Sequence, residues 1–546
     1  MAADESRSAL IRGDALLIRR KRLHPLLIFA LLFTSLFLLH APLLRLPYFW
    51  DEAGYYIPAA RDLLLNGSLI PHSTATNAHP PLMLVWLALW WKLSGYTPAV
   101  TRTAMLLMAA LGLLAVFRLG RYVANLRVAV AATASTALYP VFFTQSSMAH
   151  ADLPAAALSL WGVALLVEHR RTWSVIAFCI AVLAKETAVI VPAAIAVWEL
   201  FWRVRRHGHD RRFAPPPPRL IASCMLAVAP MVTLAAWYAY HYTRTGYVFG
   251  NPEFFHYNVV TTLQPLRMVL AFAKRLWQIT GYMNLFLLTA AAAMAMAFPV
   301  QMDGNQPRER IALDVQALFA VIIAAQVILY SLIGGAPLAR YMLSSLPLVI
   351  IICVSTIWRR MRQWPVIIGI VCAGFVLAWF VNPPYTFTLE DNLAYRDYVL
   401  LHKRAAELIA HQHGNERVLT AWPATDELSR PYLGYTKVAV PVLPVENFSP
   451  PELLAASRDS SRFHLALVFS TKYDPPHNLL RRLPLWQRWQ ARFFGYHRDL
   501  PPEIAAQLLG GRVIFRDSRN GQWVALIALE HAENAGIPNP DSATRP

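Results

Sequence analysis

The chain has 546 residues, of which 56% are hydrophobic and only 15% are charged, a composition that excludes a soluble enzyme with a single membrane anchor. The formal net charge of +18 is spread over short segments between apolar runs, which indicates topology signals and anionic lipid contacts rather than a nucleic-acid surface. Because all its cysteines lie within apolar runs, neither a disulfide framework nor a thiolate metal site is indicated for Cys179, Cys224, Cys353 and Cys372.

The first apolar run covers residues 25–46 and follows a basic cluster at residues 19–22. This charge order is also that of a secretory signal peptide, but the run is too long and lacks a small-residue cleavage site. We therefore expect a retained first span whose basic end lies in the cytoplasm.

Basic clusters also set the direction of the later spans, because each of them then falls on the cytoplasmic side. The spans expected after the first are residues 99–117, 128–148 and 153–167, two that flank 185–186, then 220–240, 284–300, 312–333, 342–358 and 365–381. Two further apolar stretches are predicted as helices lying in the interface: residues 80–94, which are rich in tryptophan, and residues 265–282, which carry three basic side chains.

From residue 382 onward the sequence becomes polar, alternating and rich in turn residues. We expect an amphipathic helix, two buried strands and a hairpin about Asn520-Gly521 at residues 393–413, 417–422, 463–470 and 512–530. The predicted fold is a polytopic α-helical membrane protein with about eleven spans and interfacial helices, plus a small extracytoplasmic α/β domain. The predicted domains are residues 1–381 and 382–546.

An acidic pair, Asp51-Glu52, follows the first span directly, within the aromatic segment 48–56. Ionisable groups at the edge of the hydrocarbon lose hydration, so they are usually kept for ions, proton transfer or a charged substrate. The alternative is structural, since Asp51 could cap a helix over residues 52–65.

More polar groups are predicted on the same side of the membrane, namely His79, Asp152, Lys185, Glu186, His256 and Arg340. Helix N-termini near several of them favour an anionic phosphate, and the guanidinium of Arg340 suits phosphate better than hydrocarbon. Each of the others also has a structural alternative. Asp152 could cap a helix, His79 and His256 could be loop or interfacial residues, and Lys185 could pair with Glu186.

The order of these residues resembles that of the polyprenyl-phosphate-sugar glycosyltransferases of the GT-C superfamily, which include protein O-mannosyltransferases and lipid A aminoarabinose transferases. The resemblance covers residues 47–347 and rests on Asp51-Glu52, His79-Pro80-Pro81, Arg102, Asp152, Leu183-Ala184-Lys185 and Ala339-Arg340-Tyr341. It implies that Asp51 is catalytic and that Asp152 supports the site. The aminoarabinose branch has lysine at the position of His79, which argues against a lipid A substrate.

The expected activity is inverting transfer of a sugar from a polyprenyl-phosphate donor to an extracytoplasmic acceptor, in the bacterial inner membrane. Asp51 would remove the acceptor's proton, Glu52 would orient Asp51 or the acceptor, and cations would stabilise the leaving phosphate. The expected donor and phosphate contacts are Arg340, His79, Lys185, Arg102 and Tyr341. Glu253 and His256 are candidates for an acceptor or metal contact. A divalent metal could bind beside Asp51, Asp152 and Glu253, but no ligand spacing requires one.

Two other function classes compete with this prediction. A transporter or flippase for lipid-linked sugars would also need outward basic groups, but it should carry internal repeats and polar residues deep in several spans. The sequence has neither. A non-catalytic assembly subunit would require the acidic positions to be dispensable.

Overall fold

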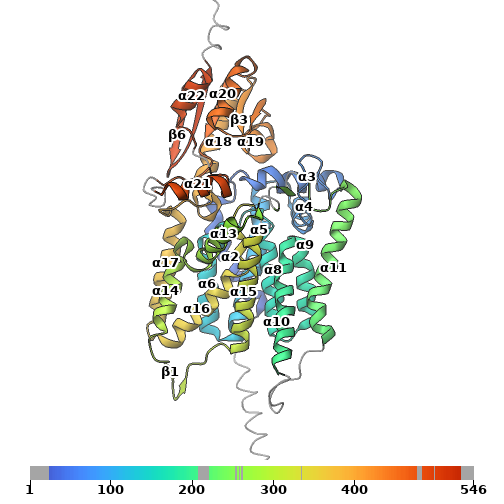
Figure 1. Cartoon of the computed structure of the whole chain (residues 1–546), viewed down its shortest axis with the longest axis vertical. Helices are drawn as coiled ribbons and strands as arrows, with labels where there is room; N and C mark the ends of the chain where they lie inside the picture. The colour runs from blue at the N-terminus through green and yellow to red at the C-terminus, as the bar shows by residue number, and fades with distance from the viewer. Residues whose placement is uncertain are drawn as a thin grey trace, which may run out of the picture.

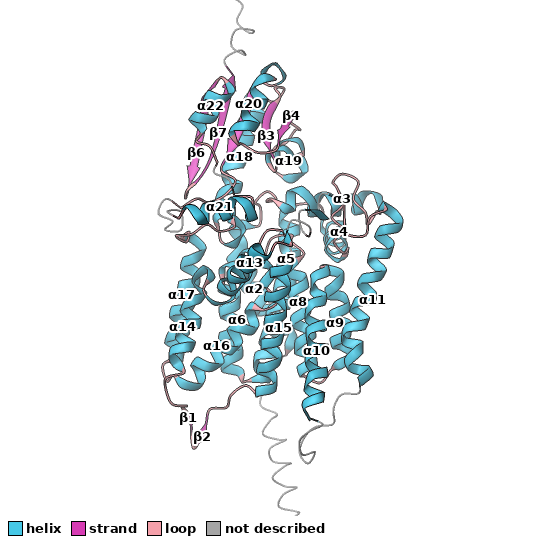
Figure 2. Ribbon diagram, viewed as in Figure 1, coloured by secondary structure: helices cyan, strands magenta, loops and turns pink. Residues whose placement is uncertain are grey.

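The computed structural model describes residues 24–206, 220–252, 255–256, 259, 262–333, 335–475, 483–496 and 499–529. A bundle of helices forms the larger part of the molecule, and a smaller domain of helices and strands stands on one end of it (Figures 1 and 2). The helices of the bundle are α2 (Pro25–His40), α5 (Pro98–Val123), α6 (Leu126–Leu138), α7 (Pro140–Gln145), α8 (Asp152–Val167), α9 (Arg171–Ala184), α10 (Ile190–Arg206), α11 (Leu220–Thr245), α14 (Leu285–Ala295), α15 (Leu313–Leu332), α16 (Leu346–Arg360) and α17 (Trp364–Phe380).

Four helical segments within the described residues are long and apolar enough to cross a membrane, and several shorter helices are also apolar. The four segments are Pro25–Leu43, Pro98–Val123, Ser223–Thr245 and Leu313–Leu332. The count of about eleven spans stays a prediction. The two stretches assigned to the interface do form helices, α4 (Leu82–Ser94) and α13 (Pro265–Thr280), and both lie near the end that carries the second domain (Figure 1).

Small residues allow the bundle helices to approach one another closely. Gly162 of α8 faces the ring of Phe178 on α9, and a Cβ placed at Gly162 would lie 2.4 Å from the ring atom Cε1. At Gly112 of α5, an added Cβ would be 3.1 Å from the Cβ of Ala157 on α8. The packing of α5, α8 and α9 therefore depends on glycine and alanine at their contacts.

Basic segments gather at the bundle end that lies away from the second domain. A hairpin of β1 (Met302–Asp303) and β2 (Gln306–Pro307) extends from that end (Figure 1). Arg127 lies 3.5 Å from Asp303, and Arg308 donates to the carbonyl of Trp358 at 2.5 Å. This arrangement agrees with the sidedness expected from the charges, although which end faces the cytoplasm stays a prediction.

The second domain is built on a five-stranded sheet in the order β4-β3-β5-β7-β6. The strands are β3 (Val418–Ala421), β4 (Val442–Val445), β5 (Leu465–Phe469), β6 (Gly511–Arg519) and β7 (Gln522–Leu529). β3 pairs in parallel with β4 and β5, whereas β7 is antiparallel to β5 and β6. The expected hairpin turn is present, because Asn520 and Gly521 both have positive φ. Strand β4 was not predicted, since it is short, contains Pro444 and lies at the sheet edge.

Helices α18 (Ala394–Gln412), α19 (Ala424–Ser429), α20 (Pro450–Arg458), α21 (Pro484–Phe494) and α22 (Pro502–Leu509) complete this domain. Its residues dock directly on the segment that carries the acidic pair. Tyr435 donates through its hydroxyl to the carbonyl of Tyr48 at 3.0 Å, and the ring of Trp422 packs edge-on against Trp50 at 5.2 Å between centroids. The second domain therefore forms part of the surroundings of Asp51.

Gly162→Ala should destabilise the bundle, because its new methyl group would overlap the ring of Phe178. Overpacking of this kind costs about 1 to 3 kcal/mol, so the melting temperature of the purified protein should fall. Gly369→Ala in α17 is the matched control, since an added Cβ there meets nothing within 4 Å. Equal melting temperatures for the two variants would contradict the close α8–α9 contact.

Candidate active site

The segment after α2 turns its two adjacent carboxylates toward different surroundings. Trp50 has a left-handed backbone conformation (φ 46°), and Asp51 follows it as the N-cap position of the short π-helix Glu52–Tyr56. The side chain of Asp51 is 35% exposed, whereas that of Glu52 is fully buried. Asp51 makes no capping hydrogen bond to this helix, so the capping alternative is not what the geometry shows.

Glu52 and Arg102 form a buried ion pair that ties neighbouring loops together. Arg102 donates to both oxygens of Glu52, at 2.7 and 3.0 Å, and Glu52 also accepts the backbone N–H groups of Phe49 and Ala149. Neither side chain is exposed, and neither lines the cavity described below. The contacts give this pair a structural role, and the expected roles of Glu52 in orienting Asp51 or the acceptor and of Arg102 in contacting phosphate stay predictions.

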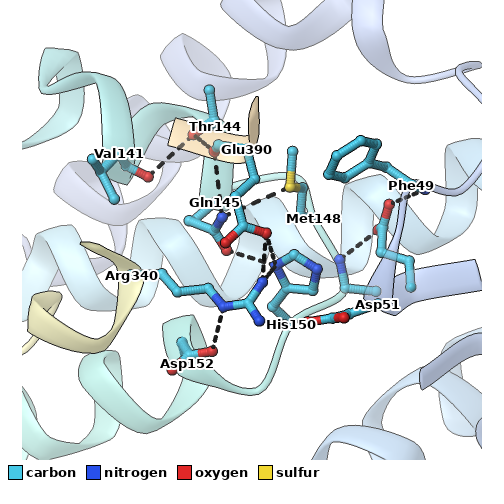
Figure 3. A network of polar contacts seen from close by, with 12 residues as sticks. Phe49, Asp51, Val141, Thr144, Gln145, Met148, His150, Asp152, Arg340 and Glu390 are labelled. Carbon is cyan, nitrogen blue, oxygen red and sulfur yellow. Dashed lines mark hydrogen bonds and ion pairs between the residues drawn. The ribbon is translucent and has the colours of Figure 1, made fainter. Parts of the chain in front are cut away.

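Arg340, at the start of the 3₁₀ turn Ala339–Met342, is the centre of the site. Its guanidinium donates to Asp51 Oδ2 through Nη2 and to Glu390 Oε2 through Nη1 at 2.5 Å, while Nε lies 3.2 Å from Asp152 Oδ2. Figure 3 shows Asp152, His150 and Glu390 converging on it. Arg340 also lines the cavity described below, so the phosphate contact expected from the sequence stays a prediction beside these carboxylate contacts.

Asp152 and Lys185 form a second buried ion pair beside this centre. Lys185 Nζ lies 2.6 Å from Asp152 Oδ1, and both side chains are less than a tenth exposed. Asp152 is the first residue of α8 rather than its cap, and the cap position Ala151 has no side-chain hydrogen bond. Asp152 therefore does not cap a helix, and Lys185 pairs with Asp152 rather than with Glu186, so neither structural alternative for these two residues is observed.

His79 and Tyr341 lie on the wall of the same cavity. His79 Nδ1 is 2.9 Å from Glu186 Oε2. Burial alone would raise the pKa of Glu186, but His79 and Lys185 outweigh it and lower that pKa to about 2. The ring of Tyr341 stacks on Tyr330 and lies 4.1 Å from Lys185 Nζ.

Sequence reasoning missed two residues of the site, Glu390 and His150. Glu390 lies in the 3₁₀ turn Leu389–Asp391 and is 3% exposed. His150 is buried, and its Nδ1 lies 3.1 Å from Arg340 Nη1. A signal for Glu390 was present, because the pair Glu390-Asp391 follows the last apolar run as Asp51-Glu52 follows the first. For His150 the sequence offered none.

The environment of these residues changes the pKa of each. Burial raises the pKa of Glu390 to about 8, with Arg340 opposing the shift and the nearby carboxylates adding to it. Burial and the positive charges of Arg340, Arg102 and Lys185 hold the pKa of His150 well below its ordinary value. His150 is therefore neutral beside the arginine.

A cavity of about 1520 Å³ lies between the bundle and the second domain. Its wall includes Asp51, Lys185, Arg340 and Glu390 from the site, and Trp422, Lys472, Trp486 and Tyr496 from the second domain. Most of the lining is aromatic or aliphatic. Because pockets for small molecules usually measure roughly 300 to 1,000 Å³, this cavity is larger than a typical site for one small ligand.

Helix α13 places a cation on this wall. Lys274 is exposed to the cavity and has no hydrogen bond or ion pair with any residue that the structure describes. The other basic residues of α13 do have hydrogen-bond partners, because Arg267 donates to the carbonyl of Gly335 and Arg275 to that of Leu338. The surrounding protein shields Lys274 from bulk water, and this burial, together with the charge of Arg275, lowers its pKa to about 8.

The described residues contain no group of three or more histidine, cysteine, aspartate or glutamate side chains suited to a metal ion. The guanidinium of Arg340 stands between Asp51 and Asp152, where a cation shared by the two carboxylates would have to lie. Of the candidate acceptor or metal contacts, His256 is exposed and outside the cavity wall, and Glu253 falls outside the described residues.

Comparison with known proteins gives the same fold. Residues 78–237 match the family model of dolichyl-phosphate-mannose-protein mannosyltransferase. The structure is similar to that of ArnT from Cupriavidus metallidurans in the apo state, with 14% identity, a TM-score of 0.50, and coverage of 91% of this chain and 97% of that one. ArnT bound to undecaprenyl phosphate matches over the same shares, with 13% identity and a TM-score of 0.50. No curated protein sequence matches. The expected resemblance to GT-C glycosyltransferases is thus confirmed.

Glu52→Gln should sharply reduce the folded yield and the melting temperature. The change leaves the buried charge of Arg102 uncompensated, which costs about 3 to 5 kcal/mol. Glu168→Gln is a matched control, because Glu168 pairs with Arg118 in a partly exposed position where an ion pair contributes little. If Glu52→Gln proves as stable as Glu168→Gln, the structural role given to Glu52 is wrong.

Proposed function

We propose that this chain is a glycosyltransferase that moves a sugar from a polyprenyl-phosphate donor to an extracytoplasmic acceptor. The observation that carries the proposal is the partly exposed carboxylate of Asp51, held by Arg340 on the wall of a large cavity between an apolar bundle and a second domain. The shared fold supports a lipid-linked donor, because ArnT has been seen with undecaprenyl phosphate. The corresponding location is the bacterial inner membrane, with the second domain outside.

In the proposed reaction Asp51 accepts the proton of the acceptor's nucleophile. The nucleophile then forms a bond to the anomeric carbon, whose bond to the donor's phosphate oxygen breaks with inversion. The lipid phosphate leaves as a monoester anion, so the reaction needs no general acid. Arg340 and the Asp152–Lys185 pair hold the base in place, which avoids reorganisation during the reaction.

Lys274 is the best candidate for binding the donor phosphate. The cations predicted for this role are committed to carboxylates: Arg340 to Asp51 and Glu390, Lys185 to Asp152, Arg102 to Glu52, and His79 to Glu186. Lys274 keeps its charge available to the cavity. A phosphate bound there would be stabilised by charge-assisted hydrogen bonds as its negative charge grows on leaving.

The lipid part of the donor also has a matching surface. Leu270, Ala273 and Trp277 lie on the same helix as Lys274 and line the cavity with it, and Ile333 adds to this apolar wall. A chain of isoprene units fits such a surface by burial of apolar area. The phosphate would then lie between the apolar wall and Asp51.

Asp51→Asn should leave folding and donor binding almost unchanged but lower turnover by roughly 10² to 10⁴. Asparagine keeps the size of the side chain but cannot accept the proton. The measurement is sugar transfer from labelled polyprenyl-phosphate donor by purified protein, with the exposed Asp314→Asn as control. Near-normal turnover by Asp51→Asn would remove Asp51 from catalysis.

Lys274→Gln should weaken donor binding at least tenfold, a loss typical of one charge-assisted contact. In the unchanged protein, affinity should be full below pH 8 and decline as the pH rises through 8, because the cation is the binding form and its pKa is about 8. Lys274→Arg should keep the affinity at pH 9. Titration with polyprenyl phosphate measures both effects, with the exposed Lys92→Gln as control, and a pH-independent affinity would argue against Lys274.

A further inference from the structure

We propose that Glu390 is a positioning residue that competes with Asp51 for the guanidinium of Arg340. The segment that joins α17 to the second domain carries Glu390, so this segment affects how readily Asp51, the proposed base, accepts a proton. This inference rests on the proposed function for its kinetic consequence. The competition itself is a property of the folded chain and can be tested without the reaction.

The two carboxylates take opposite ends of one guanidinium. Glu390 Oε2 lies 2.5 Å from Nη1 of Arg340, and Asp51 Oδ2 accepts from Nη2 (Figure 3). Their exposures differ, because the side chain of Glu390 is 3% exposed and that of Asp51 is 35% exposed. All three side chains line the cavity, and Glu390 is the more buried partner of Arg340 while Asp51 is the more exposed one.

Hydrogen bonds to the bundle hold the turn that places Glu390 beside Arg340. Its carbonyl accepts the hydroxyl of Thr144 at 2.7 Å, and the neighbouring Asp391 accepts the hydroxyl of Tyr282 at 2.6 Å. The N–H of Leu393 donates to the carbonyl of Trp379 at the end of α17. Because α18 begins at the next residue, the same turn also leads into the second domain. The position of this carboxylate is thus set jointly by the bundle and the second domain.

The protonation state of Glu390 affects how readily Asp51 accepts a proton. The groups that face Glu390 are Arg340, His150, Asp391, Asp51 and Asp152. When Glu390 is ionised, it takes a share of the positive charge of Arg340, so Asp51 is less neutralised and accepts a proton more readily. When Glu390 is protonated, the positive charge of Arg340 interacts more strongly with Asp51, and Asp51 accepts a proton less readily. The raised pKa of Glu390, about 8, places this change within the range where enzymes are assayed.

The direct test is a double-mutant cycle on thermal stability at pH 9, using Asp51→Asn, Glu390→Gln and the double variant of the full chain. Competition predicts coupling, because Asp51 becomes the main partner of Arg340 once Glu390 is neutral. Asp51→Asn should therefore lower the melting temperature more in the Glu390→Gln background than in the unchanged protein. Additive shifts would overturn the proposal. If Glu390→Gln does not fold, Glu390→Asp, which retracts the carboxylate from Arg340, replaces it in the cycle.

The kinetic test measures sugar transfer from pH 6 to 9. Lys274→Arg serves as the background, because it keeps the donor contact charged up to pH 9. In that background turnover at saturating donor should rise through about pH 8, and adding Glu390→Gln should remove the rise and lower turnover roughly tenfold at pH 9, with the KM for donor within about twofold. Glu390→Asp should restore part of the rise. A pH profile unchanged by adding Glu390→Gln to that background would contradict the inference.

Two controls separate charge from shape. Asp391→Asn changes the adjacent buried carboxylate, and Thr144→Val removes the hydrogen bond to the Glu390 carbonyl without changing any charge. Thr144→Val should keep the rise near pH 8, whereas Asp391→Asn should keep a rise but move it to lower pH, because the charge of Asp391 helps to raise the pKa of Glu390. Loss of the rise in Thr144→Val would overturn the charge argument in favour of a purely structural turn. If the unchanged protein transfers no sugar from the polyprenyl-phosphate donor, the proposed function is contradicted. The double-mutant cycle on thermal stability would still show whether Glu390 and Asp51 compete for Arg340.

Discussion

The sharing of one buried guanidinium by three carboxylates is the constraint on which the site depends. Arg340 joins Asp51 from the first loop, Asp152 from the start of α8 and Glu390 from the turn after α17, so it connects segments that lie far apart in the sequence. A buried arginine stays charged, so its burial is stable only when such partners offset the lost hydration, and each partner is held in turn by that charge. Removing a single carboxylate therefore changes the electrostatics of the others.

In this arrangement, different cations hold the carboxylates of the site and contact the proposed donor. Arg340 holds the carboxylates, whereas Lys274 has no hydrogen bond or ion pair with another described residue and lines the cavity from a helix whose other basic side chains bind backbone carbonyls. The second domain adds Trp422 and Trp486 to the cavity wall and reaches the site through the turn at Glu390. In the proposed enzyme, the base, the donor contact and the second-domain side of the cavity thus come from different parts of the chain, and packing fixes their relative positions.

The sequence allowed the helical class, the second-domain strands β3, β5 and the β6–β7 hairpin, and a cluster of polar residues to be predicted, because hydropathy and turn residues are local signals. Partners within the cluster could not be predicted. Asp51 and Glu52 are adjacent and chemically alike, yet the left-handed backbone at Trp50 leaves one at the cavity and buries the other against Arg102. Glu390 was assigned to the second domain because nothing local shows that its turn folds back onto Arg340. Lys274 was recognised only as part of an amphipathic helix, since its availability depends on what its neighbours bind.

The most direct measurement for this account is an experimental structure of the full chain with a polyprenyl phosphate. We expect the phosphate in the cavity within hydrogen-bonding distance of Lys274 Nζ, the isoprenoid along α13, and Arg340 still bound to Asp51 and Glu390. A phosphate bound by Arg340, with the carboxylates released from it, would contradict the separation of roles between the arginine and the lysine.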